Sequence, residues 1–204
     1  VGWFTSPDIM VAQINNGTLD LVGSARASIA DPFLPKKIKD GREDDIKECI
    51  GCNICASCYN QGIPVRCTQN PSMGEEWRRG WHPEIMKPKT SEESILIIGG
   101  GPAGLEATLS LARRGYEVTL ADDHKELGGR INKESILPGM SAYRRVTDYR
   151  TSQIQQLPNV NIFLENELQS EDVLGLGFDH VVTATGSTWE LSTLDSHFVS
   201  QPIE

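Results

Sequence analysis

The residues with the clearest chemistry are the five cysteines of this 204-residue chain, which all lie in one short stretch. Intervals of two residues let successive thiolates reach adjacent corners of an iron–sulfur cube, and the fourth ligand usually comes from further along the chain. The spacing therefore predicts a [4Fe-4S] cluster bound by the first three cysteines and the last. These ligands are Cys49, Cys52, Cys55 and Cys67. Cys58 is left over, although the sequence alone allows it to replace Cys55.

A zinc site is the main alternative for these cysteines. Zinc with four cysteine ligands usually takes two Cys-x2-Cys pairs that are separated by a longer loop. Here the second pair follows the first after only two residues, which favours the cluster. A disulfide framework is disfavoured, because residues 1–4 lack the basic segment of an export signal and thiols stay reduced in the expected cytoplasmic location.

A dinucleotide-binding motif follows the cysteines. Residues 94–98 are apolar enough for a buried strand, and residues 99–104 carry the spacing Gly-x-Gly-x-x-Gly before a predicted helix. In such a motif Gly99 permits the tight turn, Gly101 lets a pyrophosphate approach, and Gly104 allows the helix to pack closely on the strand. The pyrophosphate would lie at the positive N-terminus of that helix.

An acidic residue stands where the ribose of the nucleotide would lie. A second strand is predicted at residues 117–121, and Asp122 follows it, placed to accept hydrogen bonds from the ribose hydroxyls. An acid there favours an unphosphorylated ribose, as in FAD, ADP or NAD. Gly128 and Gly129 offer a second close approach of the backbone to a pyrophosphate. The alternative is a glycine-rich turn that binds no ligand.

A third candidate site lies near the start of the chain. Residues 5–17 predict a helix, and residues 19–23 predict a strand that ends at Gly23. The small residues after this strand and the guanidinium of Arg26 suit a phosphate group, which TIM barrels often bind after their last strands. The alternative is an ordinary surface arginine.

The remaining segments supply the other elements of the expected fold. Residues 42–48 predict a short helix that leads into the cysteines. Residues 141–156 predict a helix whose Arg144, Arg145 and Arg150 are expected to form a solvent-exposed face. Two further strands are predicted at residues 160–164 and within residues 179–186.

Composition and charge exclude some classes of function. Hydrophobic residues make up 38% and charged residues 23% of the chain, which is typical of a soluble globular protein. The formal net charge of -9 argues against nucleic acid or an anionic membrane as a partner. The longest apolar run, residues 95–98, is far shorter than a membrane span. Because the chain starts without Met, we expect it to be a segment of a longer protein.

Together these motifs resemble the iron–sulfur flavoprotein branch of the old yellow enzyme family, which includes trimethylamine, dimethylamine and histamine dehydrogenases and 2,4-dienoyl-CoA reductase. The resemblance extends to about Trp189. It is carried by residues 23–26, 29–33, 49–55, 74–83, 99–104, 128–129 and 184–186. The cysteine intervals and residues 78–84 and 148–154 are more similar to the amine dehydrogenases than to the reductases.

The resemblance implies a fold and a set of cofactors. The fold class would be α/β, with residues 1–45 as the end of an FMN-binding TIM barrel and residues 46–90 as the [4Fe-4S] segment. Residues 91–204 would be an incomplete Rossmann-like domain that binds FAD or ADP. The family pattern places Arg26 on the phosphate of FMN and agrees with the four cysteine ligands chosen from the spacing.

The activity that the resemblance implies is oxidation of a methylated amine. FMN would accept a hydride from this small-molecule substrate, and the cluster would pass electrons to an electron-transferring flavoprotein. No catalytic residue is expected in this chain, and the expected assembly is a homodimer. The alternative is an NADPH-dependent 2,4-dienoyl-CoA reductase, in which electrons run from NAD(P)H through FAD and the cluster to FMN. A hypothesis of another class is a non-catalytic electron-transfer or nucleotide-binding segment.

Overall fold

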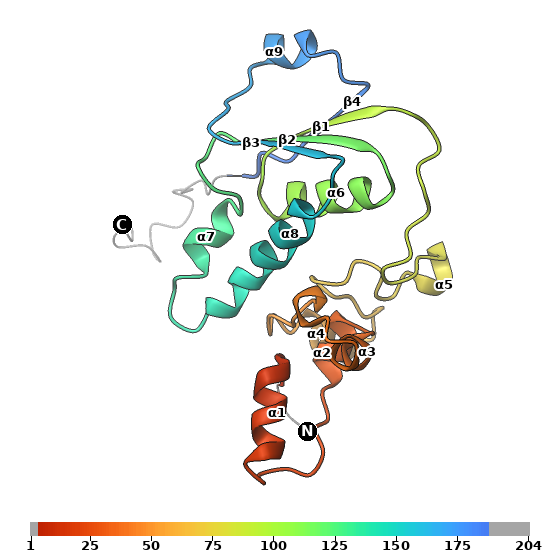
Figure 1. Ribbon diagram of the computed structural model, residues 1–204, viewed down its shortest axis with the longest axis vertical. Coiled ribbons are helices and arrows are strands. Elements are labelled where there is room, and N and C mark those ends of the chain that lie inside the picture. Colours follow the sequence, from red (N-terminus) through yellow and green to blue (C-terminus); the bar gives the residue numbers. More distant parts are fainter. Residues whose placement is uncertain (1–3, 188–204) are drawn as a thin grey trace.

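The computed structural model describes residues 4–187, and its main feature is one parallel sheet (Figure 1). The sheet has four strands in the order β3-β2-β1-β4. Their bounds are Ser94–Ile98 for β1, Glu117–Ala121 for β2, Val160–Phe163 for β3 and His180–Thr183 for β4. The parallel sheet confirms the predicted α/β class and the strands predicted in the second half of the sequence.

The composition of β1 explains its central place in the sheet. Ile95, Leu96 and Ile97 are each at most 4% exposed. A central parallel strand is covered on both faces, so a continuous run of aliphatic residues suits it better than an alternating pattern. β1 pairs in parallel with β2 as far as Ile98 and Ala121, and it pairs with β4 on its other side. The ends of these strands therefore meet where the glycine motif begins.

Two helices cover one face of the sheet, as Figure 1 shows. They are α6, Pro102–Arg113, and α8, Arg145–Gln155. Leu105 and Leu109 of α6 and Ile154 of α8 are at most 2% exposed and belong to one apolar core with the strands. Burying such a side chain stabilises a fold by about 1.5–3 kcal/mol. These helices therefore close the apolar core over this face of the sheet.

Three shorter elements complete this part. They are α7, Arg130–Glu134, the 3-10 helix η2, Ser141–Arg144, and α9, Ser170–Gly175. Figure 1 places α9 on the side of the sheet opposite to α6 and α8. The helix predicted at residues 141–156 is thus divided, because its first turn is 3-10 and only the rest is α-helical.

The chain before the sheet consists of short helices and loops. Their bounds are α1, Pro7–Asn15, α2, Ala25–Ala30, α3, Leu34–Lys39, the 3-10 helix η1, Glu43–Asp45, α4, Ile54–Asn60, and α5, Glu76–Arg79. The helix predicted at residues 5–17 is confirmed. Ser6 occupies its N-cap position, and Gly17 follows its end with φ +66°.

Two predictions for this part are wrong. Residues 19–23 form no strand, and Leu21 is 86% exposed. A strand needs a paired neighbour to be stable, and no strand of residues 4–187 lies beside this segment. The helix predicted at residues 42–48 is only the single turn η1. It ends because Ile46 is extended, with φ -77° and ψ 124°, and packs into a small apolar core.

A buried ion cluster holds this N-terminal part together. Lys37 is 1% exposed, and its Nζ donates to the carboxylate of Asp31 at 2.7 Å and to the carbonyl oxygen of Asp45 at 2.8 Å. It also pairs with the carboxylate of Glu84. Burial lowers the pKa of Lys37, but the bonds to Asp31 and Glu84 outweigh it and hold that pKa above its ordinary value. Next to this ion cluster lies a small apolar cluster of three buried residues, Ala27, Leu34 and Ile46.

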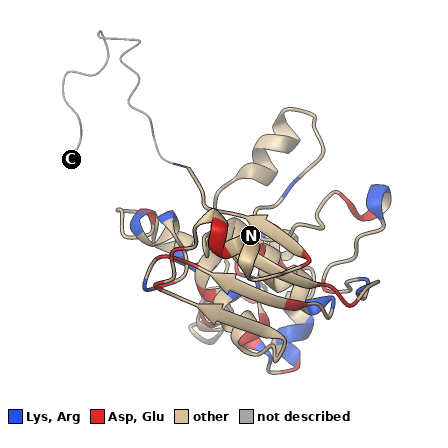
Figure 2. Cartoon of the chain, turned by 90° about the horizontal axis from the view of Figure 1, so that it is seen from above, with Lys and Arg blue, Asp and Glu red and all other residues tan. Residues whose placement is uncertain are grey.

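The surface carries charges of both signs. Figure 2 shows basic and acidic positions interspersed over the described elements. Some form ion pairs between residues four apart in the sequence, such as Lys36 with Asp40 and Arg130 with Glu134. Exposed pairs of this kind contribute at most about 1 kcal/mol each. Within residues 4–187, every helix is too short or too polar to cross a membrane.

Candidate functional site

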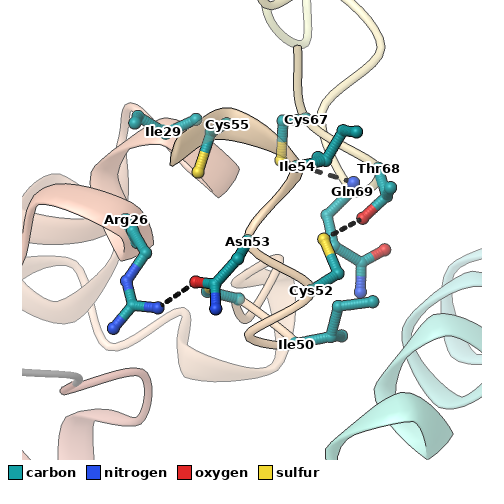
Figure 3. Close-up of a pocket in the computed structure, with 11 residues that line it drawn as sticks. Arg26, Ile29, Ile50, Cys52, Asn53, Ile54, Cys55, Cys67, Thr68 and Gln69 are labelled. Atoms are coloured by element: carbon teal, nitrogen blue, oxygen red, sulfur yellow. Dashed lines mark hydrogen bonds between the residues drawn. The ribbon is translucent and has the colours of Figure 1, made fainter. Parts of the chain in front are cut away.

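Four of the five cysteines surround one cavity (Figure 3). They are Cys49, Cys52, Cys55 and Cys67. All five cysteines are free thiols. Cys58 is 5% exposed within α4 and lies outside the lining of the cavity. The structure therefore brings together the four cysteines that the spacing selected, and their role as ligands stays a proposal.

Left-handed turns bring the first cysteines around the cavity. Gly51 has φ +73° and Asn53 has φ +58°, a conformation that glycine adopts freely and asparagine tolerates. Asn53 is the N-cap of α4, so Cys55 lies in the first turn of that helix. The N–H of Gly51 donates to Cys49 Sγ at 3.4 Å. These turns lie between Cys49 and Cys55, and both cysteines line the same cavity.

The last cysteine of the cavity comes from a separate loop. The N–H of Gln69 donates to Cys67 Sγ at 3.4 Å, and the Thr68 hydroxyl lies 3.2 Å from Cys52 Sγ. Burial raises the pKa of the Cys67 thiol, backbone hydrogen bonds oppose this rise, and the charges of Cys52 and Cys49 add to it. A bound cation reverses this preference, because it stabilises the thiolate form.

The spacing of the cysteine sulfurs can be compared with that around a zinc ion. Zinc binds cysteine at about 2.3 Å in a tetrahedron, which places its sulfurs about 3.8 Å apart. Within residues 4–187, the three candidate ligand side chains that lie within 4.8 Å of one another are Asp122, Asp123 and His124, and not three of the cysteines. No three cysteine sulfurs in the described part of the chain are therefore as close together as the ligands of one bound zinc ion.

Arg26 lies at the start of α2 and lines the same cavity. Its Nη1 donates to Asn53 Oδ1 at 2.5 Å, as Figure 3 shows. Gly23 precedes α2 in an irregular segment, where the Ser24 hydroxyl donates to the carbonyl oxygen of Phe4 at 2.5 Å. The predicted phosphate-binding arginine and the predicted cluster ligands are therefore adjacent, whereas Gly23 lies outside the cavity lining.

The glycine motif forms the turn between β1 and α6. At Gly104 a Cβ atom would lie 1.8 Å from the carbonyl oxygen of Gly99, so only glycine allows this approach of helix and strand. Gly99 has φ +107°, and a Cβ there would meet the carbonyl oxygen of Ala184 at 2.4 Å. Gly101 instead faces open space, with nothing within 4 Å of an added Cβ. The geometry thus fits close packing at Gly104 and an accessible backbone at Gly101.

A second glycine loop lies directly against the first. The N–H of Gly128 donates to the carbonyl oxygen of Gly100 at 2.8 Å, and a Cβ on Gly129 would lie 3.2 Å from Gly101 Cα. Asp122 is 7% exposed, and its Oδ2 accepts the N–H of Gly100 at 2.5 Å. The structure therefore places the two glycine loops and the ribose-binding candidate in one cradle at the N-terminus of α6.

The prediction of a solvent-exposed arginine face on α8 is wrong for Arg150, which is 4% exposed. Its Nε pairs with Glu106 of α6 at 2.7 Å, and its Nη1 donates to Gln69 Oε1 at 2.8 Å. Arg145 donates to the carbonyl oxygen of Cys49 at 2.9 Å. The signal was present in the sequence, because Arg150 lies four residues after Val146 and so shares its buried helix face. Arg144, with 43% of its side chain exposed, fits the prediction.

Comparisons with known proteins find a matching family for each part of the chain. The NADH:flavin oxidoreductase / NADH oxidase family matches residues 1–45, and the pyridine nucleotide-disulphide oxidoreductase family matches residues 93–199. Dimethylamine dehydrogenase from Hyphomicrobium sp. (strain x) is 44% identical over 209 residues, which cover 100% of this chain and 28% of that protein.

Two solved structures have similar folds and higher identity. Histamine dehydrogenase from Rhizobium sp. 4-9 superposes with a TM-score of 0.90 at 56% identity, over 93% of this chain and 27% of that one. 6-Hydroxypseudooxynicotine amine oxidase from Pseudomonas geniculata N1 superposes with a TM-score of 0.89 at 56% identity, over 93% of this chain and 28% of that one. The chain thus spans between 27% and 28% of the length of these relatives. The chain belongs to the pyridine nucleotide-disulphide oxidoreductase family, and its similarity to dimethylamine and histamine dehydrogenases fits the old yellow enzyme-like flavoproteins that the sequence resembles.

Proposed function

We propose that this chain is the cluster-binding and nucleotide-binding segment of an oxidoreductase that oxidises a small methylated amine. When bound, FMN and a [4Fe-4S] cluster would supply electron acceptance and one-electron transfer toward an acceptor such as an electron-transferring flavoprotein. The observation that carries the proposal is one cavity lined by Cys49, Cys52, Cys55, Cys67 and Arg26. The 56% identity to histamine dehydrogenase and the 44% identity to dimethylamine dehydrogenase support it.

In this proposal residues 46–90 hold the cluster through the four cysteines of the cavity. The N–H groups of Gly51 and Gln69 donate to the sulfurs of Cys49 and Cys67 at 3.4 Å. Such hydrogen bonds stabilise negative charge on sulfur and so help to set the reduction potential. The left-handed turns at Gly51 and Asn53 would hold the first ligands in place before the cluster binds.

Residues 1–45 would be the end of an FMN-binding barrel. The match of these residues to the NADH:flavin oxidoreductase / NADH oxidase family supports this. Arg26 would bind the phosphate of FMN, because a guanidinium fork suits phosphate oxygens. Since Arg26 also lines the cysteine cavity, the FMN site and the cluster site would be neighbours, as electron transfer between them requires.

Residues 91–204 would bind ADP or FAD, and the end of this unit lies outside the described residues. The open backbone at Gly101 and the N-terminus of α6 would receive the pyrophosphate. Gly129, with φ +54°, would approach it from the second loop. Asp122 would accept hydrogen bonds from the ribose while it keeps its bond from Gly100.

Metal and nucleotide analysis of the full-length protein, purified without oxygen, tests this proposal. We expect about four iron and four sulfide per polypeptide, as a [4Fe-4S] cluster contains, and ADP released by denaturation. FAD in place of ADP would favour the NADPH-dependent reductase of enoyl thioesters. Zinc without iron or labile sulfide would contradict the proposal.

Reduction of the flavin distinguishes the direction of electron flow. Under anaerobic conditions, dimethylamine should bleach the flavin absorbance, and an oxidised electron-transferring flavoprotein should restore it. NADPH should not bleach it. Bleaching by NADPH alone would support the reductase, and no bleaching by either donor in protein that holds all its cofactors would support a non-catalytic role.

A further inference from the structure

Helix α8 contacts both ends of the cysteine segment. Arg145 Nη1 donates to the carbonyl oxygen of Cys49 at 2.9 Å. Arg150 Nη1 donates to the side-chain oxygen of Gln69 at 2.8 Å, two residues after Cys67. One helix of the nucleotide-binding part therefore contacts the first proposed ligand, Cys49, and a residue two positions after the last.

Arg150 is the more constrained of the two arginines. It is 4% exposed, and a buried guanidinium is stable only when it is paired and hydrogen-bonded. Its Nε pairs with Glu106 Oε2 at 2.7 Å, and its Nη1 also donates to the carbonyl oxygen of Val146 at 3.0 Å. Glu106 lies on α6, the helix that begins at the glycine motif. Arg150 thus connects that helix to Gln69.

Gln69 links Arg150 to Cys67 through two hydrogen bonds. Its side chain accepts the bond from Arg150, while its backbone N–H donates to Cys67 Sγ at 3.4 Å. Its Nε2 also donates to the carbonyl oxygen of Glu48 at 3.5 Å, next to Cys49. A change at Arg150 therefore alters the orientation of a residue that hydrogen-bonds one ligand and contacts the segment of another.

We propose that Arg150 is a positioning residue for Cys67 and that Arg150 and Glu106 together tune the reduction potential of the cluster. This inference rests on the proposed function, because it requires a cluster at the cysteines. Residues that orient the ligands of a metal typically change its affinity by about 10- to 100-fold when they are replaced. Arg150 has the contacts of such a residue through Gln69.

The two charges have opposite effects on the potential. Reduction makes a cluster more negative, so a nearby positive charge favours the reduced state and a nearby negative charge disfavours it. Arg150 and Glu106 largely compensate each other while both are present. Arg150→Gln is therefore expected to lower the potential, and Glu106→Gln is expected to raise it. An ion pair that only stabilised the fold would produce no such pair of opposite shifts.

A redox titration of the full-length protein, followed by electron paramagnetic resonance, measures these shifts. In Arg150→Gln we expect a lower potential and cluster loss that is about 10-fold faster. Arg150→Lys keeps the charge but not the planar fork, so its potential should stay near the wild-type value while its cluster loss is faster. Arg114→Gln is the matched control, because Arg114 contacts Lys87 and Tyr116 and its loss should change neither quantity.

Several results would overturn the inference. An unchanged potential and an unchanged rate of cluster loss in Arg150→Gln would show that Arg150 does not act on the cluster. Shifts of the same sign in Arg150→Gln and Glu106→Gln would indicate general disruption instead of charge tuning. Wild-type protein without iron would instead contradict the proposed function. If Arg150→Gln does not fold, Gln69→Leu keeps the Arg150–Glu106 pair and should still lose its cluster faster, with an unchanged rate again overturning the inference.

Discussion

The sheet part, residues 94–183, and the N-terminal part, residues 4–90, are held together by different interactions. The sheet part has an apolar core of ten buried residues from its strands and helices, with Leu105 and Leu120 fully buried. The buried apolar cluster of the N-terminal part has three residues. Instead of a large apolar core, the N-terminal part has the buried Lys37–Asp31 ion pair and four cysteines that line a cavity.

This difference indicates which part depends on a bound ligand for its stability. Apolar burial is non-directional and needs no ligand, so the sheet part can be stable without its nucleotide. Ion pairs and metal ligands stabilise a fold only when every partner is in place, because a buried charge without its partner is costly. We therefore expect the N-terminal part to respond strongly to the loss of single polar groups or of a metal.

Replacing a cysteine of the cavity should have the largest effect. Cys67→Ser removes a proposed ligand, so we expect loss of the cluster and faster hydrogen exchange in residues 46–70, with exchange in β1 and β2 unchanged. Hydrogen exchange with mass spectrometry and iron analysis measure this. Cys58→Ser is the control, because Cys58 lies outside the cavity lining, and it should keep its iron. If Cys58→Ser lost its iron and Cys67→Ser kept it, Cys58 would be the ligand and Cys67 would not.

Breaking the buried ion cluster should have the next largest effect. Lys37→Met leaves Asp31 buried without its cation, and we expect this to destabilise the N-terminal part by about 3–5 kcal/mol. Denaturant unfolding followed in the N-terminal part measures the loss. Because the pKa of Lys37 is raised in the folded protein, its contribution is complete at neutral pH and falls only as the pH rises through that pKa.

Lys36→Met is the matched control for this ion cluster. Lys36 lies next to Lys37 in α3, its side chain is 66% exposed, and it pairs with Asp40 at the surface. We expect its loss to cost less than about 1 kcal/mol. Equal losses for Lys36→Met and Lys37→Met would show that the buried pair does not hold this part together.

A substitution that creates a cavity in the apolar core tests how the sheet part is stabilised. Leu109→Ala, at a position that is 2% exposed, should destabilise the sheet part by about 2–5 kcal/mol and leave the iron content of properly folded protein unchanged. Leu174→Ala changes a side chain that is 83% exposed, so it should alter the free energy of unfolding by less than about 0.5 kcal/mol. Loss of iron in folded Leu109→Ala protein would show that metal binding depends on the apolar core of the sheet part and not only on the polar contacts made by α8.

The smallest effect is expected at the nucleotide. Asp122→Asn removes the charge of the proposed ribose acceptor, and we expect ADP to bind about 10- to 100-fold more weakly, as the loss of a charged hydrogen bond implies. Calorimetry on protein freed of nucleotide measures this. Asp123→Asn is the control, because Asp123 is 58% exposed and adjacent in sequence. Equal effects at both positions would remove Asp122 from the ribose site.

Elements whose apolar residues pack into the core of the sheet part could be predicted from the sequence, and features that depend on a partner distant in sequence could not. The strands β1 and β2 and the helix α6 follow from runs of aliphatic residues and from the glycine motif between them. The strand predicted at residues 19–23 fails because pairing, and not composition, makes a strand. The exposed face predicted for α8 fails at Arg150. Its position four residues after Val146 indicated burial, but only the tertiary structure shows that Glu106 and Gln69 bind its guanidinium.

The sequence by itself determined the cysteine spacing, the glycine motif and the acid after β2, because these depend on local chain geometry. Gly104 illustrates this, since the close approach to Gly99 allows no other side chain. Only the tertiary structure decided that Cys55 lines the cavity while Cys58 does not, a choice that the spacing left open, and that Arg26 lines it too. These contacts join segments that are distant in sequence, and they depend on how the short helices and α8 pack together.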